Sequence, residues 1–277
     1  MNSFKVGRYN QLPILEFSPH GAYLDGGDKK ILMPQKYVAE NLVEGDLVEV
    51  FVYYDQNDRL VATTEQPLAE VGQFAVLKVA WTNRYGAFLD WGLTKDLFVP
   101  FKEQGRKMEK GKSYLVYIYI DDKTGRLVAS SKLDKFLKLE THEYHKGQTV
   151  NIIVWKQTEM GYKVIVDGTY VGLVYNNEIF QVLHIGEQLN AVIKNVRPDG
   201  KLDVALQTDG ILHADDFSER LLTMLKSSDG FLPVGDKTSP DEIYKLFSVS
   251  KKTFKKAVGI LYKKKILSID SDGIRLL

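Results

Sequence analysis

The sequence contains no cysteine among its 277 residues, which excludes disulfide bonds and thiolate-bound metal centres. It also lacks any apolar run that approaches the roughly 18 residues of a membrane-spanning helix. The opening residues, MNSFKVGRYN, include no apolar stretch of signal-peptide length. These absences predict a soluble, cytoplasmic protein that has no membrane partner.

The net charge is also small, at +1, but the charges are unevenly distributed. Residues 1–70 carry six basic and eleven acidic side chains, and residues 139–211 carry six and nine. Residues 71–138 carry thirteen basic and seven acidic side chains, and residues 212–277 carry twelve and nine. The second and fourth segments, at +6 and +3, are therefore expected to attract nucleic acid. The first segment, at −5, is expected to be dispensable for such binding.

Three copies of one pattern fill the first three segments. They open with VGRYNQLPILEF, VGQFAVLKVAW and KGQTVNIIVW, and each continues to a glycine in HGAYLDGG, YGAFLDWG or MGYKVIVDG. Corresponding glycines lie 65 or 66 residues apart between the first two copies and 75 apart between the second and third. An offset that holds at several landmarks predicts three structural repeats.

Each copy is expected to consist of short strands. The segments VEVFVYY, SYLVYIYI and NAVIKNV are rich in β-branched and aromatic residues and are bounded by turn sequences. In the second copy the pattern predicts strands near 73–81, 86–90, 96–100, 113–121 and 127–131. Five short strands in about 65 residues favour a closed or nearly closed barrel, because a flat sheet of this size would leave exposed edges.

The fourth segment changes to helical spacing. Apolar residues at helical intervals mark residues 217–226, and Ser239-Pro240 starts a second helix that runs to about Phe247. Ser250 caps a third helix, KKTFKKAVGILYKKK, and a hairpin follows around 271–273. Three helices and a two-stranded wing predict a winged-helix domain.

The copies resemble S1-type RNA-binding domains of the OB-fold class. The second copy supplies the characteristic element as YGAFL from Tyr85, and the third supplies GLVYNNE from Gly172, with Tyr175 where the family often has histidine. The first copy is the most divergent, since it keeps HGAY from His20 but has ILMPQK at Ile31.

The whole chain, with its ending SPDEIYKLFSVSKKTFKKAVGILYKKKIL, resembles the conserved virulence factor B family of bacterial RNA-binding regulators. The resemblance implies a mainly β protein with three tandem five-stranded OB-fold barrels and a C-terminal α/β winged-helix domain. It also implies single-stranded RNA as partner, regulation of gene expression, and neither catalysis nor a cofactor. The expected domains are residues 1–66, 67–137, 138–210 and 211–277.

Candidate RNA contacts are aromatic side chains, which stack on bases, and basic side chains, which meet phosphates. In the second copy we expect Tyr85 and Phe88 to stack, although Phe88 equally suits the barrel core. Arg84 and Arg126 are expected on neighbouring strands beside them. In the third copy Trp155 suits either stacking or the core. The remaining candidates there are Lys156, Tyr162, Lys163 and Tyr175.

The third helix of the winged domain is strongly basic, with no acidic residue from 249 to 269. Phe254, Val258 and Leu261 fall on its apolar stripe and are expected in the core. The other face is expected either to contact nucleic acid or to be merely a solvated surface. The candidate contacts on that face are Lys252, Lys255, Lys256 and Lys263.

Two rival functions remain open: a transcription regulator that reads duplex DNA through the third helix, and a nuclease. The segment GRKMEKGKS at Gly105 approaches a phosphate-binding loop, but it has one residue too many between its glycines and leads into a strand. His142 and His145 are spaced like metal ligands without an evident third ligand nearby. No catalytic residue and no metal site is therefore predicted.

Overall fold

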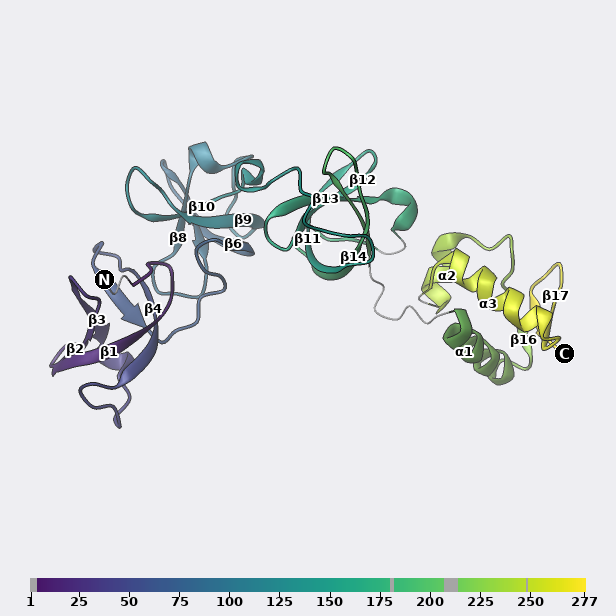
Figure 1. Ribbon diagram of the computed structural model, residues 1–277, viewed down its shortest axis with the longest axis horizontal. Coiled ribbons are helices and arrows are strands. Elements are labelled where there is room, and N and C mark those ends of the chain that lie inside the picture. The colour runs from purple at the N-terminus through teal and green to yellow at the C-terminus, as the bar shows by residue number, and fades with distance from the viewer. Residues whose placement is uncertain (1–3, 180–181, 207–213, 248) are drawn as a thin grey trace. The chain divides into compact units, whose positions relative to one another are not determined.

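The computed structural model describes residues 4–179, 182–206, 214–247 and 249–277. Three closed five-stranded barrels are followed by three helices and a small sheet (Figure 1). The predicted mainly β architecture with a C-terminal winged helix is confirmed. The chain divides into two compact units, Met1–Leu137 and Lys138–Leu277. None of the helices in the described ranges combines the length and apolar character that are needed to cross a membrane.

The three barrels share one topology, in which the third and fifth strands pair in parallel and all other neighbours are antiparallel. The first barrel consists of β1 (Arg8–Ser18), β2 (Gly21–Asp25), β3 (Lys30–Pro34), β4 (Leu47–Tyr54) and β5 (Leu60–Thr63). The second consists of β6 (Phe74–Thr82), β7 (Gly86–Asp90), β8 (Leu97–Pro100), β9 (Ser113–Ile120) and β10 (Leu127–Ser130). The third consists of β11 (Thr149–Thr158), β12 (Gly161–Val166), β13 (Tyr170–Tyr175), β14 (Gln188–Val196) and β15 (Leu202–Leu206). The strands expected in the second copy are therefore confirmed to within about a residue at each end.

The repeated glycine at the start of each second strand is required by a close backbone approach. A Cβ atom on Gly86 would lie 2.2 Å from the carbonyl oxygen of Val99 on β8, and one on Gly161 would lie 2.0 Å from that of Val174 on β13. Both distances are far inside van der Waals contact, so only glycine lets these strands pair here.

We predict that Gly86→Ala destabilises the first unit by about 1–3 kcal/mol, because the added methyl group forces β7 away from β8. Chemical denaturation monitored by circular dichroism measures the loss. Gly105→Ala is the matched control, since a Cβ atom there would meet only ordinary contacts at 3.7 Å. Equal stabilities of the two variants would refute the close-approach argument.

The first two barrels share a hydrophobic core. Phe51, Tyr53 and Val61 of the first barrel pack in one buried cluster with Trp91 and Leu93 of the second. The Phe51 and Trp91 rings meet edge to face with centroids 5.7 Å apart. The first barrel is therefore not an independent module, and its removal would expose the buried Trp91 ring to water. The expectation that the first segment is dispensable for nucleic-acid binding was based on its charge alone and took no account of this shared core.

The winged-helix domain contains α1 (Ala214–Ser227), α2 (Pro240–Phe247) and α3 (Lys251–Lys263). Both predicted helix starts are confirmed: the Ser250 hydroxyl accepts a hydrogen bond from the Thr253 amide at 3.0 Å, and that of Ser239 accepts one from the Glu242 amide at 3.2 Å. The predicted two-stranded wing was incomplete. A two-residue strand, β16 (Phe231–Leu232), pairs with β18 (Ile274–Leu276), which also pairs with β17 (Leu267–Ile269).

Candidate nucleic-acid interface

An aromatic row crosses the outer surface of the second barrel. Phe88 on β7 lies opposite Trp81 on β6 and opposite Phe98 on β8. The Trp81 and Phe88 rings are stacked, with centroids 3.7 Å apart and planes 5° from parallel, and Phe98 continues the row at 4.9 Å from Phe88. The Trp81 side chain is 41% exposed, and its indole N–H donates to the Asp96 carboxylate at 2.7 Å. Neighbouring rings of the row therefore pack on one another, and the hydrogen bond to Asp96 fixes the orientation of the exposed Trp81 indole.

A β-bulge in β6 determines which side chains belong to this aromatic row. The pairing of β6 with β7 shifts between Val79 and Trp81, so Trp81 turns outward opposite Phe88 while Ala87 and Leu89 point into the core. Phe88 is half-buried on the outside, which settles the alternative between core and surface in favour of the surface. Trp81 and Phe98 were missed as candidates. Strand alternation from the core residue Val99 would have placed Phe98 on the outside, whereas alternation from Val79 would have placed Trp81 in the core, and only the bulge turns it outward.

Tyr85 extends the aromatic surface at the start of β7. Its ring is 59% exposed, and the exposed Arg84 guanidinium lies 4.8 Å from the ring centroid. The Asn83 carboxamide oxygen accepts hydrogen bonds from the amides of Tyr85 and Gly86 at 2.8 and 3.2 Å, which fixes the turn. The term "aromatic face" below denotes this surface as a whole. Its members are Trp81, Tyr85, Phe88 and Phe98.

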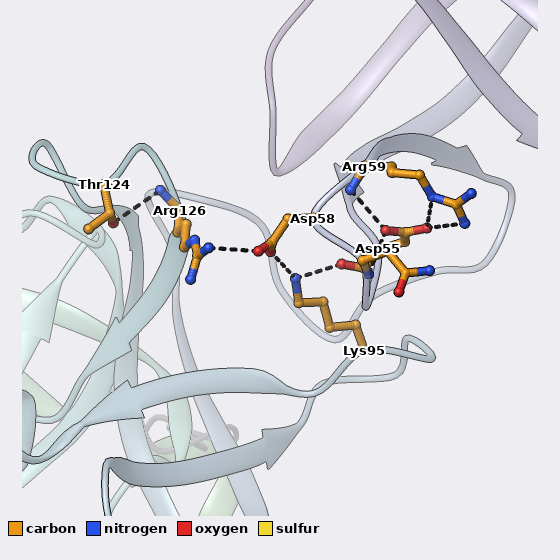
Figure 2. A network of polar contacts seen from close by, with 7 residues as sticks. Asp55, Asp58, Arg59, Lys95, Thr124 and Arg126 are labelled. Atoms are coloured by element: carbon orange, nitrogen blue, oxygen red, sulfur yellow. Dashed lines mark hydrogen bonds and ion pairs between the residues drawn. The ribbon is translucent and has the colours of Figure 1, made fainter.

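Arg126 does not lie on a strand next to Arg84, so that part of the prediction was wrong. Arg126 precedes β10, and β8 separates β10 from β7. The Arg126 guanidinium donates instead to the Asp58 carboxylate of the first barrel at 2.6 Å, and Lys95 reaches the same carboxylate at 3.0 Å (Figure 2). A phosphate at Arg126 would have to compete with Asp58.

The third barrel carries charge where the second carries aromatic rings. At the corresponding bulge Lys156 lies opposite Lys163, in the place of Trp81 and Phe88. Trp155 is the bulged residue, only 8% exposed, and the ammonium nitrogens of Lys156 and Lys163 lie 4.1 and 6.0 Å from its ring centroid. Trp155 therefore supports the lysines and does not offer a ring face for stacking.

The two candidate tyrosines of the third barrel are half-buried at the same end of the antiparallel β12–β13 pair. Tyr162 follows Gly161, which pairs with Tyr175 on β13. The Tyr175 hydroxyl accepts a hydrogen bond from Arg197 at 2.5 Å, and Arg197 also pairs with Asp203 at 2.7 Å. Tyr175 is thus tied into a polar network and leaves little freedom for a new partner.

The first barrel has an acidic residue at this position. Glu16 lies opposite Tyr23 across the same bulge and pairs with Lys30 at 2.8 Å. The same cross-strand pair is therefore acidic–aromatic, aromatic–aromatic and basic–basic in the three barrels. At this position the second barrel presents aromatic rings and the third presents positive charge.

Helix α3 separates apolar and basic residues as predicted. Phe254, Val258 and Leu261 are buried in the winged-helix core. The four candidate lysines are exposed on the other side, and Lys255 pairs with Asp236 at 2.9 Å. Within the described ranges, no three histidine, aspartate or glutamate side chains gather closely enough to hold a metal ion.

Known families match most of the chain. The S1 domain family matches residues 6–65 and 71–132, and the CvfB-like winged helix domain matches residues 219–276. The chain is 27% identical to conserved virulence factor B of Staphylococcus epidermidis over 258 residues, which are 90% of this chain and 87% of that protein. It is 26% identical to the uncharacterized protein YitL of Bacillus subtilis over 274 residues, 95% and 90% of the two chains.

A crystal structure of a multidomain protein with nucleic acid binding domains from Streptococcus pneumoniae aligns over 98% of both chains, at 23% identity and a TM-score of 0.43. The S1 and winged-helix matches are to nucleic-acid-binding domain classes, and the curated relatives match nearly end to end. The chain belongs to the conserved virulence factor B family.

Proposed function

We propose that the protein binds single-stranded RNA by stacking unpaired bases on the aromatic face of the second barrel, and that it does so without catalysis. The observation that carries this proposal is the exposed Trp81 ring, held by its stack on Phe88, together with the exposed Tyr85 ring, which lines the same pocket as Trp81. Side chains of this kind bind single strands by stacking, which needs no particular base sequence. A duplex hides its base faces and would gain nothing from such a surface.

The basic surfaces complete the proposed interface. Lys156 and Lys163 of the third barrel and the exposed lysines of α3 suit contacts to RNA phosphates. Several weak modules on one chain bind strongly together because the second contact is intramolecular. Binding without cleavage in the cytoplasm fits post-transcriptional regulation, which is the role that the family resemblance suggests.

Duplex DNA is the second candidate partner, because a winged-helix domain with a basic α3 suits a major groove. A competition binding assay distinguishes single-stranded RNA from duplex DNA as the preferred partner. A labelled single-stranded RNA bound to the full-length protein should be displaced by unlabelled single strands at far lower concentrations than by duplex DNA of the same length. Preferential displacement by the duplex would favour the α3-centred alternative.

Tryptophan fluorescence gives a direct test of the aromatic face. The chain has three tryptophans, of which Trp81 is exposed while Trp91 and Trp155 are buried. We predict that single-stranded RNA quenches the emission and that Trp81→Phe abolishes most of the quenching, with Phe still able to stack. Quenching that persists in Trp81→Phe would place the bound bases elsewhere.

A further inference from the structure

A pocket of about 890 Å³ adjoins the aromatic face and is built by both barrels of the first unit. One wall is the aromatic face itself. The first barrel contributes the end of β4 and the β4–β5 turn to the lining, with Tyr54, Gln56 and Asp58. Because the two barrels share one buried core, both parts of the lining belong to a single packed unit.

Ion pairs hold the β4–β5 turn against the second barrel (Figure 2). Asp58, in the left-handed region at φ 57°, accepts hydrogen bonds from Arg126 and Lys95, and Lys95 also donates to the Asp55 carbonyl oxygen at 2.7 Å. The Asp55 carboxylate closes the turn on itself by pairing with Arg59 at 2.7 Å. The tip of the hairpin is therefore fixed both internally and across the barrels.

The charged side chains that line the pocket cancel to no net charge. Lys95 and Arg126 contribute two positive charges to its lining, and Asp58 and Asp96 contribute two negative charges. The hydrogen bond from Lys95, followed by the charges of Lys95 and Arg126, lowers the pKa of the Asp58 carboxyl, so it stays ionised at neutral pH. A neutral pocket with aromatic walls fits a nucleobase better than a phosphate.

We propose that this pocket receives an unstacked base of the strand bound on the aromatic face. Tyr54, which is half-buried, provides the second aromatic wall, and the exposed Gln56 carboxamide hydrogen-bonds the edge of the base. The acidic first barrel is then part of the binding site in spite of its charge. The inference rests on the proposed function, because the strand must already lie on the aromatic face.

The test uses the full-length protein and fluorescence anisotropy with short single-stranded oligonucleotides. Tyr54→Ala should weaken binding about ten-fold, within the range for one lost base stack, and Tyr54→Phe should bind like the wild type. Gln56→Ala should reduce the differences in affinity among oligo(A), oligo(C) and oligo(U). Asn57→Ala is the matched control, since Asn57 is exposed on the same hairpin but does not line the pocket.

Trp81→Ala distinguishes this inference from the proposed function. If Trp81→Ala weakens binding while Tyr54→Ala and Gln56→Ala do not, the aromatic face binds RNA and the pocket is empty in the complex. If Trp81→Ala has no effect either, the proposed function also fails. If Tyr54→Ala does not fold, the Gln56→Ala variant provides the test, because Gln56 is exposed. Unchanged affinity and unchanged base preference in Gln56→Ala would overturn the inference.

Discussion

The Tyr85→Ala/Phe88→Ala double variant is expected to bind single-stranded RNA at least about thirty-fold more weakly than the wild type. Each lost stack removes roughly 1–3 kcal/mol, so two remove about 2 kcal/mol or more. Both side chains lie on the outside of the second barrel, one exposed and one half-buried, so the fold should survive. Affinity is measured by fluorescence anisotropy, and folding by circular dichroism.

Phe17→Ala is the control for this variant, because the Phe17 ring is 41% exposed on β1 and does not line the pocket. Its affinity should match that of the wild type. Unchanged affinity in a folded double variant would show that the aromatic face is not the binding surface. Loss of the fold would show that Phe88 supports the barrel, and Tyr85→Ala alone would then carry the test.

The second large effect concerns the charge of α3. Changing Lys252, Lys255, Lys256 and Lys263 together to glutamine keeps helix propensity nearly constant and removes only charge. Affinity should fall alike for all RNA sequences, because phosphate contacts carry no sequence information. The slope of log affinity against log salt should flatten by about 2, or 0.7 for each of three contacts, since Lys255 is engaged with Asp236.

A second quadruple variant controls for the change in total charge. It replaces four exposed lysines outside α3, namely Lys29, Lys110, Lys123 and Lys146. This control should change the slope much less than the α3 variant. Equal changes in the two variants would mean that α3 is a solvated face, and the winged helix would then be better explained as a protein-interaction module.

The barrels could be predicted from the sequence because local sequence patterns define their strands. Segments rich in β-branched and aromatic residues, such as SYLVYIYI, mark a strand in each copy. Glycines such as Gly86 and Gly161 mark the start of the second strand, where a neighbouring carbonyl oxygen leaves no room for a Cβ atom. The strand β16 gave no such signal. Two residues are too short for a period, and Phe231 and Leu232 become a strand only by pairing with β18.

The site was harder to predict because it depends on register and on distant contacts. Trp81 and Trp155 both stand near the end of a first strand, yet one is exposed and the other buried, because Trp81 follows its bulge and Trp155 is the bulged residue. The pairing of Asp58 with Lys95 and Arg126 joins residues 37 and 68 positions apart. No local pattern contains that information, and charge alone pointed away from the first barrel.

Ultraviolet cross-linking of a bound single-stranded RNA, followed by mapping of the modified peptides by mass spectrometry, tests the central claim most directly. The account predicts cross-links on peptides that contain Trp81, Tyr85 or Phe88, with further cross-links in the third barrel. A full-length, RNA-bound protein whose cross-links fall only on α3 or the third barrel, with none in the second barrel, would contradict it.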